Sequence, residues 1–322
     1  MKLLVLGGTA FVGRHIVEAA RARGHEVTIF HRGKTNKHVF PDLEKIIGER
    51  DSDLAPLANR TWDAVIDTSA YLPRVVERSA RLLAERVAHY TFVSSVSVYK
   101  SFATIGMTEN APRAVIAEPL PDVINAETYG AMKARCERAA ANHYPGRLLV
   151  VRPGIIVGPY DYIGRFAYWP RRIAQGGEVL APGEPTHPLQ VIDARDLAAW
   201  MIARIEVADA GLYNATGPSE PLTWGTFLEE CQRVTKSIAD LMWAPDMLLR
   251  GEGVTGADLP LWVPATPDSA GFYTVSSAKA RAAGLVLRPL GDSLTDVLAS
   301  SQGTTGMART REAEVLRRLT GV

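Results

Sequence analysis

A glycine-rich turn near the start of the chain separates an apolar run from an amphipathic stretch, and this arrangement restricts the fold more than any other feature. Residues 3–6 form a short apolar run of the kind that buried parallel strands show, and the run ends at Gly7. Between residues 12 and 23 the apolar residues fall on one helical face, and Gly24 stands where a helix cap is expected. The β-branched run at 27–30 predicts a second strand. The chain therefore opens with a strand-helix-strand unit.

The same alternation of strands and helices continues to about residue 151. Further short apolar runs lie at 45–47, 64–67, 90–93 and 148–151, and helical stretches lie near 74–86 and 127–143. Strands that alternate with helices pair in parallel, and the helices cover both faces of the sheet. The pattern therefore predicts an α/β fold with a doubly wound parallel sheet.

The rest of the chain predicts a division into unequal parts. The pattern loosens beyond residue 158. The stretch from about 217 to 275 is rich in Trp, Pro and Leu, and we interpret it as a smaller helical lobe that caps the sheet domain. The predicted sheet domain comprises 1–158, about 189–216 and 276–300. The predicted capping lobe comprises about 159–188 and 217–275, and 301–322 is predicted to form a solvated terminal helix.

The charge balance excludes several classes of partner. Lys and Arg number 36 against 35 Asp and Glu, so no basic excess points to nucleic acid or to an anionic membrane. No 18 apolar residues run together, so no membrane span is expected. The two cysteines, Cys136 and Cys231, form neither a disulfide framework nor a metal cluster. We expect a cytoplasmic protein that acts on a small molecule.

The glycine-rich turn has the residues that a dinucleotide site needs. Glycine lets the backbone turn sharply and approach a pyrophosphate, which then lies at the positive N-terminal end of the following helix. The residues predicted to contact the cofactor here are Gly7, Thr9, Ala10, Phe11, Val12 and Gly13. Ala10 stands where a middle glycine is usual, and its methyl group requires a small shift of the phosphate.

The end of the second strand indicates which dinucleotide is bound. Sites specific for NAD usually carry an Asp or Glu here for the ribose 2′-hydroxyl, whereas this chain has Arg32 and, close by, Lys34. An arginine can hold a 2′-phosphate through two charge-assisted hydrogen bonds. NADP is therefore favoured, with NAD as the alternative. Arg32 could instead stack on adenine or belong to a solvated basic loop.

Tyr129 and Lys133 stand four residues apart in the predicted helix 127–143, so their side chains share one face. An ammonium group beside a phenol stabilises the phenolate and lowers the phenol pKa from about 10 toward neutrality. We therefore expect Tyr129 to give or take a proton during a reaction.

Three serines, Ser94, Ser95 and Ser97, follow the predicted strand 90–93. Ligands of open parallel sheets bind beyond the carboxyl ends of the strands. A hydroxyl at this edge can donate a hydrogen bond to a substrate oxygen as charge develops on it. Only one of the three serines needs to be functional.

Together, the glycine-rich turn, Ser95 and the Tyr129/Lys133 pair resemble the short-chain dehydrogenases/reductases, in particular their extended, NAD(P)-dependent epimerase/dehydratase type. The resemblance covers about residues 1–215 and implies a Rossmann domain with a small C-terminal substrate lobe. It implies that Ser95, Tyr129 and Lys133 are catalytic and that Tyr129 and Lys133 also contact the cofactor. The further cofactor contacts that it implies are Thr68, Ser69, Ala70, Pro153, Ile155 and Ile156.

Some residues depart from the family pattern. Many members that act on nucleotide sugars have a phosphate-binding arginine where this chain has Leu189, which cannot replace it. The turn and the His-Arg-Gly loop at 31–33 also resemble an atypical subgroup that includes isoflavone-reductase-like enzymes and chloroplast stem-loop-binding proteins. Aromatic residues in the segments expected to form the pocket suit a ring-shaped substrate; they are Tyr160, Tyr162, Phe166, Tyr168, Trp169 and Trp262.

These observations lead to three functional hypotheses. The first is an NADP-dependent oxidoreductase, either a carbonyl or imine reductase or an alcohol dehydrogenase, acting on a small cyclic or aromatic non-nucleotide substrate. The alternative is an NAD(P)-dependent epimerase or dehydratase of a sugar or nucleotide sugar. The third is a catalytically silent protein that binds a cofactor or RNA. The resemblance also implies a homodimer.

Overall fold

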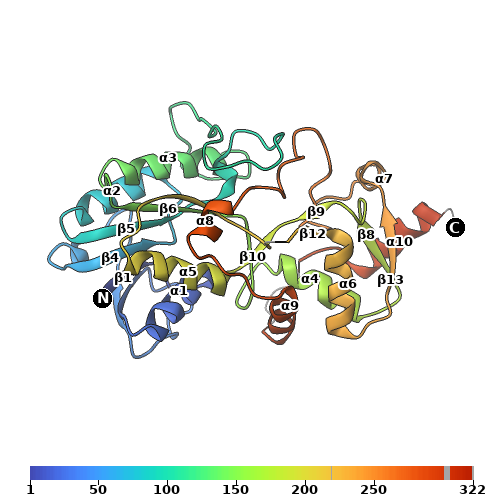
Figure 1. Cartoon of the computed structure of the whole chain (residues 1–322), viewed down its shortest axis with the longest axis horizontal. Helices are drawn as coiled ribbons and strands as arrows, with labels where there is room; N and C mark the ends of the chain where they lie inside the picture. The colour runs from blue at the N-terminus through green and yellow to red at the C-terminus, as the bar shows by residue number, and fades with distance from the viewer. Residues whose placement is uncertain (219, 301–304, 321–322) are drawn as a thin grey trace.

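The computed structural model describes residues 1–218, 220–300 and 305–320, which form a sheet domain and a smaller lobe side by side (Figure 1). The sheet domain is built on a seven-stranded sheet in the order β11-β6-β5-β4-β1-β2-β3, and every neighbouring pair in it is parallel. The predicted doubly wound parallel sheet is thereby confirmed. The strands are β1 (Lys2–Leu6), β2 (Glu26–His31), β3 (Glu44–Ile47), β4 (Trp62–Asp67), β5 (Val87–Val93), β6 (Leu148–Pro153) and β11 (Gly211–Ala215).

Helices cover both faces of the sheet because alternate strand residues point to opposite sides. On β1, Leu3 and Val5 pack under α1 (Phe11–Ala22) and α5 (Ala194–Glu206). Leu4 and Leu6 pack on the other face, under α2 (Pro73–Leu83) and α3 (Tyr129–Ala141). Short 3-10 turns lie at Ala55–Leu57 and Val96–Val98, and α8 (Ala278–Ala282) packs on β11.

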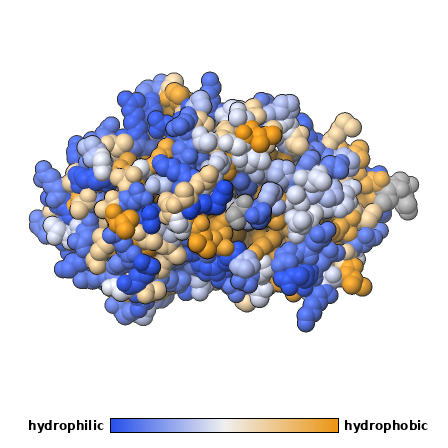
Figure 2. Space-filling view, viewed as in Figure 1, coloured by the Kyte–Doolittle hydropathy of each residue, from blue (hydrophilic) through white to orange (hydrophobic). Residues whose placement is uncertain are grey.

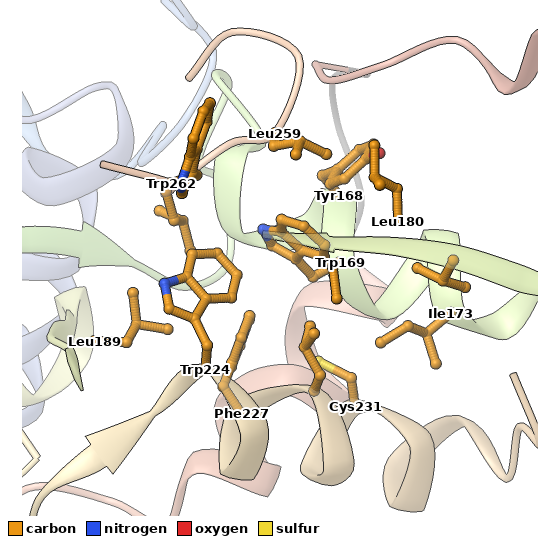
Figure 3. Close-up of a cluster of buried hydrophobic side chains, with 14 of the residues drawn as sticks. Tyr168, Trp169, Ile173, Leu180, Leu189, Trp224, Phe227, Cys231, Leu259 and Trp262 are labelled. Atoms are coloured by element: carbon orange, nitrogen blue, oxygen red, sulfur yellow. The ribbon is translucent and has the colours of Figure 1, made fainter. Parts of the chain in front are cut away.

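The smaller lobe has a core of its own, which includes Trp169, Trp224 and Trp262 and packs on α6 (Trp224–Thr235) (Figure 3). Two of its elements, α4 (Arg165–Ala174) and β8 (Glu178–Pro182), lie where the sequence pattern loosens and were not predicted. The reason is that α4 contains Pro170 and that two glycines precede β8. Its elements are α4 (Arg165–Ala174), β8 (Glu178–Pro182), β9 (Pro188–Leu189), β12 (Leu222–Thr223), α6 (Trp224–Thr235), β13 (Asp240–Ala244), α7 (Asp246–Gly251), α9 (Leu290–Ala299) and α10 (Arg309–Thr320).

Two short strands, β7 (Ile155–Val157) and β10 (Val191–Asp193), pair in parallel where the sheet domain meets the lobe. α4 begins a few residues after β7, close to the middle of the molecule (Figure 1). On the face shown in Figure 2 most of the surface is hydrophilic, and hydrophobic residues gather near this junction.

The domain boundaries differ from the predicted ones at the C-terminal end. The helix α9 falls within 276–300, which was assigned to the sheet domain, but its Leu294 and Val297 pack in the core of the lobe. The helix α10 is not solvated throughout, because Val315 is buried in the same core and Glu312 pairs with buried Arg172 at 2.6 Å. Residues 301–304 and 321–322 of that predicted segment lie outside the described residues.

Candidate active site

A cleft of about 670 Å³ opens at the carboxyl edge of the sheet, beside the adjacent strands β1 and β4 where the strand order reverses. Ligands of open α/β sheets bind at such a switch point. Ten of the residues predicted to contact a cofactor line this cleft; they are Gly7, Thr9, Ala10, Phe11, Val12, Gly13, Arg32, Lys34, Thr68 and Ser69.

The backbone of the glycine-rich turn fits a dinucleotide pyrophosphate. Gly7 has φ +114°, and a side chain there would overlap the hydroxyl of Thr68. A Cβ on Gly13 would lie 2.6 Å from the backbone nitrogen of Gly8, so helix and turn can meet only without one. The N-cap residue of α1, Ala10, makes no side-chain hydrogen bond, and the first turn has no acidic residue. The N–H groups at this positive helix end are therefore free of side-chain caps and can receive an anion.

The opposite end of the cleft is basic and open to solvent. Arg32 is 59% exposed, and its guanidinium lies 3.9 Å from the carboxylate of Glu49. The backbone N–H of Gly33 donates to Nδ1 of His31, and within the described part of the chain His31 Nε2 is buried without a partner. Burial lowers the pKa of His31, and Lys45 adds to the effect. With His31 neutral, Arg32 and Lys34 are the cationic groups of this loop that line the cleft.

The sequence analysis missed the segment that follows β3. Gly48, Glu49, Arg50 and Asp51 all line the cleft. They follow the short run 45–47 at the carboxyl edge of the sheet. The principle that ligands bind beyond the carboxyl ends of parallel strands would have found them, had it been applied to that strand as well. The guanidinium of Arg50 donates to both oxygens of Asp67 at 2.6 and 2.7 Å, and this buried pair lies beneath the cleft.

The structure brings Ser95 and Tyr129 together at the same edge of the sheet. Ser95 is the N-cap of the turn Val96–Val98, where its hydroxyl accepts a hydrogen bond from the Ser97 N–H at 3.1 Å. Tyr129 is the first residue of α3. Burial raises the pKa of Tyr129, while a hydrogen bond with Ser95 and the charge of Arg165 oppose the rise. Ser94, by contrast, donates to Glu137 at 2.6 Å, so Ser95 is the strand-end serine that faces the phenol.

Lys133 lies one turn beyond Tyr129, and its ammonium group is fully buried. Its Nζ donates to the backbone carbonyls of Ala70 at 3.0 Å and Val93 at 2.6 Å. Burial lowers the pKa of Lys133 to about 8. The expected lowering of the Tyr129 pKa by Lys133 is not what the structure shows, because the pKa is raised and the opposing cation is Arg165. Ala70, predicted as a cofactor contact, is buried and does not line the cleft. Its backbone carbonyl accepts the hydrogen bond from Lys133.

A buried polar network fixes the positions of Ser95, Tyr129 and Lys133 relative to one another. Arg152 donates to both carboxylate oxygens of Glu137 at 2.8 and 2.7 Å, and Glu137 also accepts from Ser94. The same guanidinium donates to the hydroxyl of Tyr99, which donates to Asn214 on β11 at 2.6 Å. The network joins α3, the end of β5, β6 and β11, and thereby fixes the helix that carries Tyr129 and Lys133 relative to Ser95.

Pro153, Ile155 and Ile156, which the family resemblance implied as further cofactor contacts, lie in different surroundings. Ile155 lines a small cavity, of about 10 Å³, with Val96 and Tyr273 among its neighbours. Pro153 is buried at the end of β6, and Ile156 packs against the core shared with α1 and α5. None of the three lines the 670 Å³ cleft.

Most of the aromatic residues assigned to the substrate pocket belong to the core of the lobe instead. Phe166, Tyr168, Trp169 and Trp262 are at most 9% exposed and pack with one another and with α6 (Figure 3). Tyr162 does line the cleft, while Tyr160 stacks on the guanidinium of Arg14 at 3.6 Å. Tyr71, which the sequence analysis did not single out, also lines the cleft, and its ring centroid lies 6.4 Å from that of Tyr129.

The cleft and the Ser95, Tyr129 and Lys133 cluster are those of a Rossmann-type protein that binds a nicotinamide dinucleotide. Residues 3–215 match the model of the NAD dependent epimerase/dehydratase family, and the chain belongs to this family. The family resemblance inferred from the sequence is therefore confirmed. Within the described residues, no helix is both long and apolar enough to cross a membrane.

Curated relatives are similar over most of this chain. The Epimerase family protein SDR39U1 of Bos taurus is 25% identical over 248 residues, which cover 70% of this chain and 78% of that protein. The chloroplast stem-loop binding protein of 41 kDa b from Arabidopsis thaliana is 22% identical over 240 residues, which cover 67% of this chain and 58% of that protein.

Solved structures share the fold at lower identity. The UDP-Glc/GlcNAc 4-epimerase of Campylobacter jejuni has a TM-score of 0.70 at 15% identity and covers 92% of this chain and 98% of its own. The UDP-glucuronic acid 4-epimerase of Bacillus cereus, solved in complex with NAD, has a TM-score of 0.67 at 14% identity and covers 100% of this chain and 98% of its own.

Proposed function

We propose that the protein is an NADP-dependent oxidoreductase that interconverts a carbonyl or imine with the corresponding alcohol or amine on a small non-nucleotide substrate. The observation that carries this proposal is the contact between Ser95 and the Tyr129 phenol, with Lys133 one helical turn away, beside a dinucleotide-sized cleft. This is the arrangement that proton transfer to a substrate oxygen requires.

Tyr129, Ser95 and Lys133 have separate roles in the proposed reaction. When bound, the nicotinamide supplies or accepts the hydride. Tyr129 donates its phenolic proton to the substrate oxygen, and its raised pKa keeps that proton in place until charge develops. The Ser95 hydroxyl donates a hydrogen bond to the same oxygen. Lys133 holds a buried positive charge one turn away and faces the phenyl ring of Phe92 at 4.7 Å.

The choice of NADP rests on the basic end of the cleft. Arg32 and Lys34 both line it, and Arg32 is exposed enough to turn toward a phosphate. Glu49 lies near Arg32 and would repel a 2′-phosphate, but the adjacent guanidinium offsets that charge. The glycine-rich turn would hold the pyrophosphate in either dinucleotide.

The choice of a small non-nucleotide substrate rests on the lobe. Leu189 is 1% exposed in the core of the lobe, so it offers no charge to a diphosphate. Aromatic residues near the reactive edge include Tyr71 and Tyr162 on the cleft, and Phe272 and Tyr273 on the small cavity beside Val96. Their rings suit a planar or cyclic substrate.

The substitution Tyr129→Phe tests the assignment. We expect it to reduce kcat at least 100-fold with a panel of ring-shaped aldehydes and ketones, because the proton donor is lost. The NADPH dissociation constant, measured by fluorescence titration, should change less than threefold. The matched control Tyr213→Phe removes a phenol that donates to Asp209, away from the cleft, and should leave kcat unchanged. Full activity in Tyr129→Phe would remove Tyr129 from the mechanism.

The family match favours a second function, epimerisation or dehydration of a sugar. Such an enzyme oxidises and re-reduces its substrate within one cycle, so it keeps its dinucleotide bound. Native mass spectrometry of the purified protein distinguishes the two. Retained NAD or NADH would support the epimerase, whereas NADPH that exchanges freely and is consumed stoichiometrically supports the reductase.

The name of the Arabidopsis thaliana relative, a stem-loop binding protein, suggests a third function, which is RNA binding without catalysis. The presence of Ser95, Tyr129 and Lys133 together and the net charge of +1 both argue against it. Absence of turnover with the carbonyl panel, together with salt-sensitive binding of a stem-loop RNA, would favour this third function over the first.

A further inference from the structure

Two tyrosines are exceptional among the aromatic residues of the chain. All Trp, Tyr and Phe residues lie within the described residues 1–218, 220–300 and 305–320, and among them only Tyr71 and Tyr162 are exposed, at 50% and 64%. Both line the cleft of about 670 Å³ that the glycine-rich turn also lines. Large apolar rings left open in a cleft are typical of a binding site, because burying them against a ligand is favourable.

The two tyrosines come from separate segments and belong to an apolar part of the cleft. Tyr71 lies between β4 and α2, whereas Tyr162 lies between β7 and α4. Leu72 and Val75, at the start of α2, are half-buried and line the same cleft. Tyr71 follows β4 and Arg32 follows β2, and these strands lie on opposite sides of β1. The apolar part is therefore distinct from the basic end of the cleft.

Direct contacts hold Tyr71 beside the reactive residues. Its ring centroid lies 6.4 Å from that of Tyr129, which is within the range of aromatic pairs. The ammonium group of Lys133 lies 5.5 Å from the centroid of the Tyr71 ring, as in a cation–π contact. The same ammonium group donates to the carbonyl of Ala70, the preceding residue, at 3.0 Å. Both the ring and the adjoining backbone are thus pre-organised, which lowers the entropic cost of binding a ligand there.

The charged groups near Tyr71 already have partners in the protein. Lys133 is buried and donates to two backbone carbonyls, so it offers no free charge to a ligand. Asp51, which also lines the cleft, pairs with Arg74 of α2 at 2.8 Å. The groups that remain open are rings and aliphatic side chains, which favour an uncharged ligand. A flat aromatic ring gains more from them than a saturated ring of similar size, because aromatic pairs are attractive beyond the area that they bury.

We propose that Tyr71 binds an aromatic ring of the substrate, with Tyr162 as a second contact, so that the substrate is an aryl carbonyl compound rather than an alicyclic or aliphatic one. A ring that packs on Tyr71 holds a carbonyl attached to it beside the Tyr129 phenol. This inference rests on the proposed function for the identity of the reacting group, but the binding of the ring can be measured without turnover. Tyr71 is then a specificity-determining residue that orients the substrate.

The first experiment measures binding by isothermal titration calorimetry in the presence of NADP⁺. Naphthalene-2-carboxamide is compared with its saturated counterpart, decahydronaphthalene-2-carboxamide, on the wild-type protein, Tyr71→Leu and Tyr71→Phe. We expect the wild type to bind the aromatic amide about tenfold more tightly. Tyr71→Leu should lose this preference, and Tyr71→Phe, which restores a ring, should keep it. Equal binding of the two amides by the wild type, or an unchanged preference in Tyr71→Leu, would overturn the inference.

Two controls separate ring binding from other roles of Tyr71. Met247→Ala removes an apolar side chain that is 80% exposed on α7 and does not line the cleft, and it should keep the full preference. The NADPH dissociation constant of Tyr71→Leu, measured by fluorescence titration, should stay within about threefold of the wild-type value. A loss of NADPH affinity as large as the loss of amide binding would assign Tyr71 to the cofactor and overturn the inference.

The second experiment compares the reduction of 2-naphthaldehyde and decahydronaphthalene-2-carbaldehyde by NADPH. The ratio of kcat/KM for the aromatic aldehyde to that for the saturated one should fall about tenfold in Tyr71→Leu, through KM rather than kcat, and should be kept in Tyr71→Phe. If neither aldehyde is reduced but the preference for the aromatic amide still requires Tyr71, the inference stands and the reductase proposal fails. If both aldehydes are reduced and Tyr71→Leu leaves the ratio unchanged, the reductase stands and the inference fails.

Discussion

The carboxyl edge of the sheet and the core of the lobe differ in whether the residues that stand out in the sequence are open to a cleft or buried. At the sheet edge the glycine-rich turn, Arg32, Thr68 and Ser69 remain open on a cleft of about 670 Å³. In the lobe the conspicuous aromatic residues, such as Trp169 and Trp262, are buried against one another. Position at the end of a parallel strand therefore predicts function better than residue type does, because the edge of the sheet lacks a covering helix whereas the lobe has to build its own core.

Buried charges occur in both regions. In the lobe, Arg172 pairs with Glu312 at 2.6 Å and joins α4 to α10. In the sheet domain, Arg50 pairs with Asp67 and Arg152 with Glu137, whereas the buried ammonium group of Lys133 donates to two backbone carbonyls. Burial of this ammonium group costs stability, which is typical of residues with a binding or catalytic role.

The largest expected effect is on the stability of the lobe. Trp169 is 0% exposed, and its indole N–H donates to the carbonyl of Pro260 at 2.6 Å. Trp169→Ala should lower the free energy of unfolding by about 3–5 kcal/mol through the cavity that it leaves. Urea denaturation measures the loss. The control Tyr162→Ala removes a ring that is 64% exposed and should change stability by no more than about 0.5 kcal/mol. Comparable losses of unfolding free energy in the two variants would contradict the contrast between a buried lobe core and an open cleft.

The next effect is a pH dependence of the free energy of unfolding that Lys133 causes. Its pKa is lowered to about 8 in the folded protein, so between pH 8 and 10.5 the unfolded chain binds a proton that the folded protein does not. Stability therefore rises with pH in this window, by about 3 kcal/mol in total. In Lys133→Met this rise should disappear, which unfolding measured at several pH values will show. The exposed Lys100→Met serves as control, and a persistent rise in Lys133→Met would assign it to another group.

A third effect concerns the turn at the cleft. Gly13→Ala places a methyl group against the backbone of Gly8, so the turn must move away from the position that fits a pyrophosphate. We expect about 30-fold weaker binding of NADPH, corresponding to about 2 kcal/mol, by fluorescence titration. Gly251→Ala, whose added methyl group meets open space, is the control. Unchanged affinity in Gly13→Ala would place the dinucleotide elsewhere.

The smallest effect tests cofactor choice. Arg32→Ala should raise the KM for NADPH about tenfold and leave that for NADH within twofold, because only the 2′-phosphate pairs with the guanidinium. Steady-state kinetics with both cofactors measure the ratio. Lys37→Ala, which removes another exposed charge from the same loop, should change neither value. Equal increases for the two cofactors would contradict the assignment of NADP.

The amino-acid sequence by itself determined the parallel sheet and the position of its binding edge. Apolar runs with β-branched residues and one-sided helices encode their local structure, and the glycines at the first turn mark where a backbone approaches a ligand. Tyr129 and Lys133 could be paired from their spacing alone, because four residues make one helical turn. Only the tertiary structure could decide their electrostatics, since burial raises the pKa of Tyr129 and lowers that of Lys133.

The tertiary structure also decided which side chains of the lobe are core and which face the site. Phe166 and Tyr162 stand in one short segment, yet the first is 1% exposed in the core and the second is 64% exposed and lines the cleft. The cleft residues 48–51 likewise join the site only because β3 ends at the same edge as β1 and β4. Local sequence pattern fixes the path of the backbone within each element, but burial and electrostatic partners depend on the elements that pack against it.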